Sequence, residues 1–132
     1  MDRDASQGLH RFFKEEKPVV VAYLFGSMAK ETAGRLSDVD VAILISKDYH
    51  PTLDYRLYLI SKLADILQGK VDIVILNEAS PLLRFEVIKY GKVLYCRDEA
   101  ERIAFEEKTI DEYLDMNKIE KEYLKCLLQS VG

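Results

Sequence analysis

The chain has 132 residues, 48% of them hydrophobic and 32% charged, which is enough for one domain with a sizeable core. We therefore expect a single domain over residues 1–132. Its 19 basic and 23 acidic residues give a net charge of −4 without a basic cluster, which argues against direct nucleic-acid binding. No stretch is apolar enough for a membrane span or a signal peptide, so the sequence predicts a cytoplasmic protein. Cys96 and Cys126 are predicted to be reduced, partly buried thiols.

The N-terminal segment predicts an amphipathic helix followed by a buried strand. Leu9, Phe12 and Phe13 stand at helical spacing within residues 7–17, and Pro18 ends the helix. Residues 19–25 are a run of β-branched and aromatic side chains that is typical of a buried strand. The segment 28–37 predicts a short helix and a loop.

A Gly-Ser turn and two aspartates follow the first strand. Gly26 allows a sharp turn and a close backbone approach, and Ser27 offers a hydroxyl and an N–H to a phosphate. Asp38 and Asp40 begin a second strand, and because side chains alternate along a strand, both lie on one side. The residues predicted to enter the core from the other side are Val39, Val41, Ile43 and Ile45. Two aligned carboxylates that face a Gly-Ser turn indicate a site for a divalent metal and phosphate.

The middle of the chain predicts a helix, a strand, a helix and a strand. The first helix begins at Pro51 and is closed by Gly69, and the second begins with Ser80 as N-cap and ends at Gly91. The strands cover residues 71–76 and 92–96. Asp72 stands out because a carboxylate in an apolar strand needs a partner. From the residues alone it is interpreted as a strand-end carboxylate paired with Lys70 or Lys92.

The C-terminal region, residues 98–129, consists of helix-forming residues without Pro or Gly. A single helix of this length measures about 48 Å, which is longer than a domain of this size can cover. The helix therefore either bends back near Met116 and Asn117 or projects as a docking arm, and the sequence leaves both open. The apolar stripe predicted to be mostly core comprises Ile103, Ile110, Leu114, Tyr123, Leu127 and Leu128.

Gly26-Ser27, ten intervening residues and Asp38-Val39-Asp40 resemble the GS-x10-DxD motif of the DNA polymerase beta-like nucleotidyltransferases. Within that superfamily the chain is similar to the minimal nucleotidyltransferase (MNT) antitoxins encoded beside HEPN-domain toxins. The similarity covers about residues 19–95, the core of the predicted domain. It implies an α+β nucleotidyltransferase fold with a small mixed sheet of about four strands, flanking helices and a helical C-terminus.

The resemblance also implies roles for the residues of the motif. Asp38, Asp40 and Asp72 would hold Mg²⁺ and catalyse transfer, and Gly26 and Ser27 would bind the outer phosphates of ATP. Related domains often carry Ala-Arg-Gly after the Gly-Ser pair, whereas this chain has Ala29-Lys30-Glu31. The phosphate-binding cation is therefore either Lys30 or Arg35.

The implied function is transfer of AMP from ATP to a tyrosine of a HEPN ribonuclease toxin, within a homo- or hetero-oligomer that includes the toxin. One alternative is a non-catalytic antitoxin that acts by binding alone. A second is a small-molecule nucleotidyltransferase of the aminoglycoside type, although this chain has no additional domain for such an acceptor. A polymerase or tRNA-type transferase is disfavoured because the chain lacks a basic surface.

Overall fold

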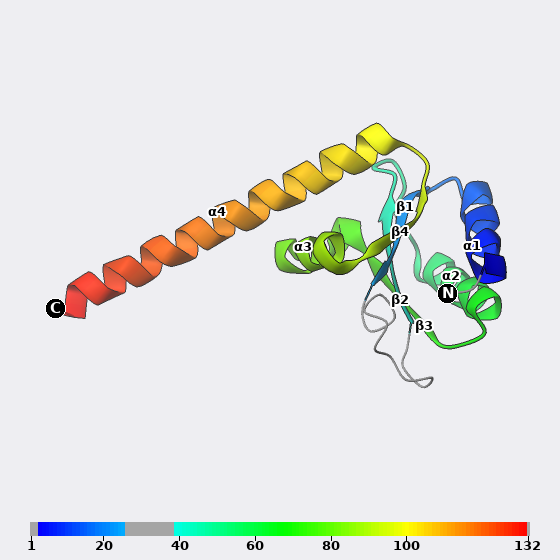
Figure 1. Cartoon of the computed structure of the whole chain (residues 1–132), viewed down its shortest axis with the longest axis horizontal. Helices are drawn as coiled ribbons and strands as arrows, with labels where there is room; N and C mark the ends of the chain where they lie inside the picture. Colours follow the sequence, from blue (N-terminus) through cyan, green and yellow to red (C-terminus); the bar gives the residue numbers. More distant parts are fainter. Residues whose placement is uncertain (1–2, 26–38, 132) are drawn as a thin grey trace.

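The computed structural model describes residues 3–25 and 39–131 and shows a four-stranded sheet with helices on both faces (Figure 1). The helices are α1 (Arg3–Glu15), α2 (Leu53–Leu67), α3 (Pro81–Tyr90) and α4 (Glu99–Val131), with a 3-10 turn, η1, at Leu76–Glu78. The strands are β1 (Val19–Phe25), β2 (Val39–Ile45), β3 (Val71–Ile75) and β4 (Lys92–Cys96). The predicted α+β class, with four strands and a helical C-terminus, is confirmed.

The strands lie in the order β3-β2-β1-β4. β1 is antiparallel to both β2 and β4, whereas β2 and β3 are parallel and are connected through α2. α1 and α2 cover one face of the sheet, and α3 with the first part of α4 covers the other (Figure 1). Because both faces are covered, the central strands β1 and β2 are apolar along almost their whole length.

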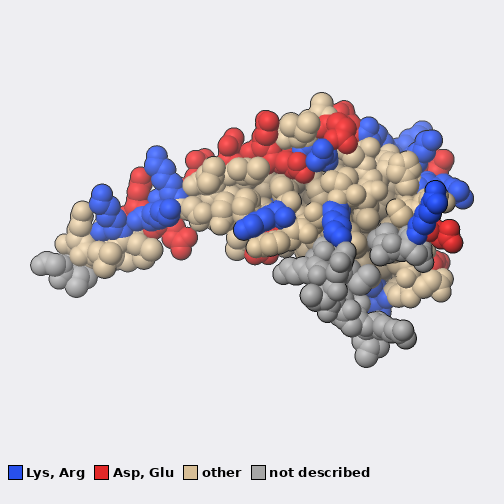
Figure 2. All heavy atoms as spheres, viewed as in Figure 1, with Lys and Arg blue, Asp and Glu red and all other residues tan. Residues whose placement is uncertain are grey.

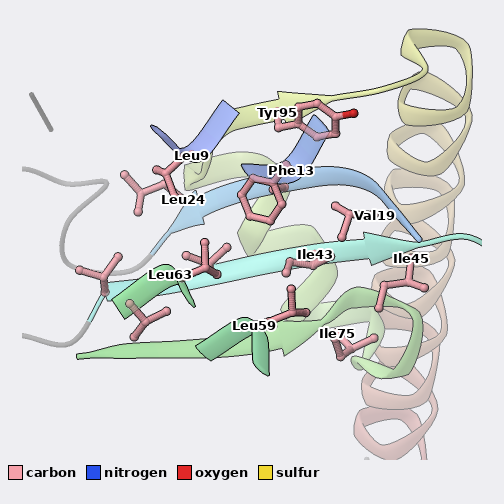
Figure 3. Close-up of a cluster of buried hydrophobic side chains, with 14 residues drawn as sticks. Leu9, Phe13, Val19, Leu24, Ile43, Ile45, Leu59, Leu63, Ile75 and Tyr95 are labelled. Atoms are coloured by element: carbon pink, nitrogen blue, oxygen red, sulfur yellow. The ribbon is translucent and has the colours of Figure 1, made fainter. Parts of the chain in front are cut away.

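The larger core lies between the sheet and the helices α1 and α2 (Figure 3). Leu9 and Phe13 of α1 and Leu59 and Leu63 of α2 are fully buried against β1 and β2. The strand residues predicted to point inward, Val39, Val41, Ile43 and Ile45, all lie in this core, as predicted. Each fully buried aliphatic side chain of this kind stabilises the fold by about 1.5–3 kcal/mol.

A second core lies on the opposite face, under α3 and the start of α4. Its buried members are Val20, Val21, Tyr23, Ala42, Leu44, Leu76 and Val87. Ala42 and Leu44 belong to the same face of β2 as Asp40, because side chains two residues apart share a face. The candidate carboxylate therefore stands at one end of a face whose remaining part is covered by helices.

Local capping residues set the ends of the helices. Thr52 caps α2 and Ser80 caps α3, each through a side-chain oxygen that accepts a backbone N–H at 3.1 and 3.2 Å respectively. The predicted Ser80 cap with Pro81 as first helical residue is confirmed. α2 ends at Gln68, which adopts the left-handed conformation with φ 57°, so the predicted closure at Gly69 is one residue late.

Gly91 forms the sharp connection from α3 into β4, as predicted. A Cβ atom at this position would collide with the backbone oxygen of Val87 and would lie 3.2 Å from the backbone oxygen of Leu24. Only glycine therefore fits where α3 packs closely against β1.

α4 is one helix of 33 residues that projects away from the sheet (Figure 1), so it does not bend back near Met116 and Asn117. The stripe predicted to be mostly core is wrong, since Ile103, Ile110, Leu114, Tyr123, Leu127 and Leu128 are all exposed. The helix is rotated so that Phe105, Thr109 and Tyr113 face the rest of the molecule instead. Burial of this face is limited to the first part of the helix.

Among the described residues, no helix is both long enough and apolar enough to span a bilayer. Cys96 and Cys126 are both free thiols, as predicted. Cys96 is partly buried, but Cys126 is exposed because it lies in the projecting part of α4.

Candidate active site

Asp40 and Asp72 are direct neighbours in the sheet. Each is the second residue of its strand, and the parallel register of β2 and β3 pairs them. Paired residues of adjacent strands lie about 4.8 Å apart and point to the same side. Asp40 is partly buried and Asp72 is exposed, so the pair can be approached from solvent. The described end of β1 is also close, because Phe25 is the register partner of Asp40.

The register that brings the two aspartates together is fixed at both ends of β2. At the start of the strand, the Val39 N–H donates to the carbonyl oxygen of Lys70 at 3.0 Å. At its end, the Asn77 side chain accepts from the Ile45 N–H at 2.9 Å and donates to the Ile45 carbonyl at 2.8 Å. A one-residue slip would break these bonds and would move Asp40 to the other face.

Asn77 is itself held in position by Arg84, a residue that the sequence analysis did not single out. The Arg84 guanidinium donates to the carbonyl oxygens of Leu76 and Asn77 at 2.7 and 2.8 Å. These bonds join a side chain to backbone groups seven and eight residues earlier, and they leave no periodic signal in the sequence. Asn77 and Arg84 thus support the candidate site from a distance.

The remaining predicted site residues, Gly26, Ser27, Lys30, Arg35 and Asp38, lie outside the described residues. Their predicted roles therefore stay predictions.

The alternative interpretation of Asp72 as an ion-pair partner is not supported. Lys92 belongs to β4, at the opposite edge of the sheet from β3, so two strands separate it from Asp72. Within residues 3–25 and 39–131, Asp72 forms no ion pair with Lys70 either. The carboxylate of Asp72 is thus available for a ligand.

A hollow of about 270 Å³ lies at the other end of β2, between η1, α3 and the first turns of α4. Its lining includes Ile45, Asn77, Arg84, Phe105 and Lys108. Asp40 and Ile45 are five residues apart in an extended strand, a separation of about 17 Å. The hollow is therefore distinct from the carboxylate pair, and the chemistry of the residues favours the carboxylate end as the reactive site.

The carboxylate pair has the oxygen ligands that Mg²⁺ prefers, namely a few carboxylates with room for water and phosphate. The part of the chain that the structure describes contains no group of three or more metal-binding side chains, and Asp38 is not in that part. The donor set of Asp40 and Asp72 nevertheless fits a divalent cation. Two adjacent carboxylates on a rigid strand pair can hold such an ion and orient a triphosphate.

A mixed sheet of this topology, with neighbouring carboxylates at one open end, is the arrangement of a nucleotidyltransferase. The family described as "Polymerase beta, Nucleotidyltransferase" matches residues 7–100, and the chain belongs to this family.

Individual relatives within this family include adenylyltransferases and toxin–antitoxin complexes. "Protein adenylyltransferase MntA" of Shewanella oneidensis is 40% identical over 93 residues, which cover 69% of this chain and 63% of the relative. The chain therefore matches less than two thirds of that relative's length. The crystal structure of a toxin–antitoxin with AMP-PNP has a TM-score of 0.75 at 27% identity, covering 93% of this chain and 98% of the matched chain. A tri-AMPylated Shewanella oneidensis HEPN toxin in complex with its MNT antitoxin matches with a TM-score of 0.68 at 25% identity, over 94% and 98%.

Proposed function

We propose that this chain is a Mg²⁺-dependent protein adenylyltransferase that acts as the antitoxin of a HEPN toxin. It transfers AMP from ATP to a tyrosine hydroxyl of the toxin, in the cytoplasm, where ATP is available. The observation that carries the proposal is the register pairing of Asp40 with Asp72 in a chain of the nucleotidyltransferase family. The similar adenylyltransferase, the AMP-PNP complex and the AMPylated toxin complex support the substrate and the partner.

The proposed reaction is an in-line displacement at the α-phosphorus of ATP. The tyrosine oxygen forms a bond to phosphorus while the bond to the departing pyrophosphate breaks, and the tyrosine proton leaves. Asp38, Asp40 and Asp72 would hold Mg²⁺, which would supply charge neutralisation and orientation of the triphosphate. Asp72 orients the attacking hydroxyl and takes up its proton. Because Asp72 is exposed, a bulky acceptor such as a folded protein can reach it.

The phosphates are held in this proposal by residues that follow β1 in the sequence. Gly26 and Ser27 bind the outer phosphates, and Lys30 or Arg35 neutralises their charge. If the Ser27 hydroxyl acts in the transition state, Ser27→Ala should cost about 1–3 kcal/mol of transition-state stabilisation. The change should lower kcat while the thermal unfolding curve stays unchanged. An unfolded variant would instead mean that Ser27 serves as a structural cap.

The proposal is tested by incubating the chain with labelled ATP, Mg²⁺ and the HEPN protein encoded beside it. Mass spectrometry should find AMP on a toxin tyrosine, and the double variant Asp38→Asn with Asp40→Asn should give none. The control Asp65→Asn, on the exposed side of α2, should transfer normally.

Three results would overturn the proposal. Transfer retained by the double variant would remove the carboxylates from the mechanism. Full neutralisation of the toxin without any AMP incorporation would identify a binding antitoxin. Label transferred to an aminoglycoside, and none to the toxin, would identify a small-molecule transferase.

A further inference from the structure

α4 is anchored to the molecule only along its first half. The Tyr23 hydroxyl of β1 donates to Glu106 at 3.0 Å, and Arg84 of α3 lies 3.7 Å from the carboxylate of Glu112. Phe85 and Tyr113 stack in parallel with their ring centres 3.8 Å apart. After Tyr113 no described side chain of the helix is buried, and from residue 114 to 129 every residue except the half-buried Asn117 is exposed. The last four turns therefore extend into solvent (Figure 1).

The exposed half continues the apolar face that the first half buries. Phe105, Thr109 and Tyr113 face α3 and the sheet at steps of four residues. Steps of three and four lead onward along the same side of the helix through Met116, Glu120, Tyr123 and Leu127. Other large apolar side chains flank this line. We define the distal face as Met116, Ile119, Tyr123, Leu124, Leu127 and Leu128, all of which are exposed.

The charged residues of the same segment lie on the other side of the helix. Lys118, Glu122 and Lys125 project away from the distal face, because helical residues repeat every 3.6 positions, whereas Lys121 lies at its edge beside Leu128. Figure 2 shows acidic side chains along the first half of α4 and lysines toward its free end. The exception is Glu120, the one charged residue of the segment that lies among the residues of the distal face, between Met116 and Leu127.

The distal face exposes a large apolar surface to water. Four of its side chains expose more than half of their surface: 67% for Ile119, 64% for Tyr123, 52% for Leu124 and 75% for Leu128. Contiguous apolar surface of this kind marks an interaction site, and a helix without tertiary contacts gains little stability of its own. A partner that covers this face would also hold the helix in shape.

We propose that the distal face binds a helical surface of the toxin, with an apolar stripe and a Lys or Arg opposite Glu120. This proposal rests on the proposed function, since it identifies where the acceptor protein is held. The partner takes the position along the second half of α4 that α3 takes along the first, packing its side chains between residues spaced three and four apart. The toxin–antitoxin relative matches 93% of this chain, which supports a toxin as the occupant.

A second copy of the chain is a poorer occupant because of Glu120. No lysine of the segment lies within the distal face, because Lys118 and Lys125 lie opposite it and Lys121 lies at its edge, beside Leu128. Pairing two distal faces would bury both Glu120 carboxylates without a cation, and burying an unpaired carboxylate is costly. A different protein can supply the missing positive charge.

The test measures binding of the full chain to the neighbouring HEPN protein by calorimetry without ATP, so that binding is separate from transfer. Tyr123→Ala with Leu127→Ala should weaken binding by at least about 100-fold, since each truncates a large apolar contact. The matched control, Lys118→Ala with Lys125→Ala, removes two side chains from the opposite side and should change affinity less than about threefold. Alanine favours the helix at all four positions, so the helix content measured by circular dichroism should be the same in both double variants as in the unaltered chain.

A second matched pair tests the charge at the centre of the distal face. Glu120→Lys should weaken binding by at least about tenfold, whereas Glu122→Lys, two residues away on the other side, should have little effect.

Equal affinities within each matched pair, or no binding by the unaltered chain, would overturn the proposal. A dimer of the chain alone that Tyr123→Ala with Leu127→Ala converts to monomer in sedimentation would assign the face to a second copy and also overturn it. The chain could also transfer no AMP while the variants of the distal face weaken binding as expected. That result would refute the proposed function and leave this proposal standing.

Discussion

The pairing of Asp40 with Asp72 predicts that replacing Asp72 by Asn has opposite effects with and without Mg²⁺. The two carboxylates lie on neighbouring strands, about 5 Å apart. At that distance two negative charges repel by about 0.8 kcal/mol in a water-like dielectric, which suits an exposed Asp72. Unfolding of 132 residues carries an entropy of about 280 cal/mol/K, so the Asn variant should melt about 3 °C higher in EDTA.

Mg²⁺ should reverse this order. If the ion binds with a Kd of about 1 mM, then 10 mM Mg²⁺ stabilises the unaltered chain by about 1.4 kcal/mol, or about 5 °C. Asp72→Asn should lose most of that gain because one ligand is missing. Thermal unfolding followed by circular dichroism, in EDTA and in Mg²⁺, measures both effects, with Asp65→Asn as the control. A lower melting temperature for Asp72→Asn in EDTA would mean that Asp72 stabilises the strand and would refute the reasoning.

Other predictions concern the support of the site and of α4. Tyr23→Phe should lower the free energy of unfolding by about 1–3 kcal/mol in a urea titration, because Glu106 loses a buried donor. The pKa of Tyr23 is raised by burial and by Glu106, so this loss should be constant from pH 6 to about pH 9. Asn77→Ala should cost about 2 kcal/mol and lower kcat, since two bonds that fix the strand register disappear. Gly91→Ala should destabilise by about 1–3 kcal/mol through overlap with the backbone, whereas Gly69→Ala, with open space around its Cβ, should change stability by less than about 1 kcal/mol.

The strands and the side on which Asp40 lies could be predicted because they depend on local patterns, whereas the proximity of Asp72 to Asp40 was implied only by the family resemblance. Alternation along β2 determined which side Asp40 takes, and the same alternation in β3 showed that Asp72 interrupts an apolar strand. Ser80, Pro81 and Gly91 marked the ends of α3 through their backbone preferences. These features need no knowledge of distant contacts, and the structure confirms them.

The rotation of α4 could not be predicted in the same way. Its apolar residues are distributed widely around the helix, so either of two apolar stripes could pack on the sheet. The spacing favours the stripe through Ile103, Ile110 and Leu114, which is exposed in the structure. Contacts with distant residues select the other stripe, through the stacking of Phe85 on Tyr113 and the bond from Tyr23. The Asn77 bonds to Ile45 were missed for the same reason, since they join positions 32 residues apart.

The stacked pair Phe85 and Tyr113 is the outermost support of α4. A small tilt of the helix at this point therefore produces a larger displacement of its free end. Eighteen residues extend beyond Tyr113, a length of about 27 Å. A tilt of about 10° at this support would move the free end by about 5 Å, roughly the rise of one helical turn. The contacts of α4 with β1 and α3, of which this ring pair is the outermost, therefore determine where the far end of the helix lies relative to Asp40 and Asp72.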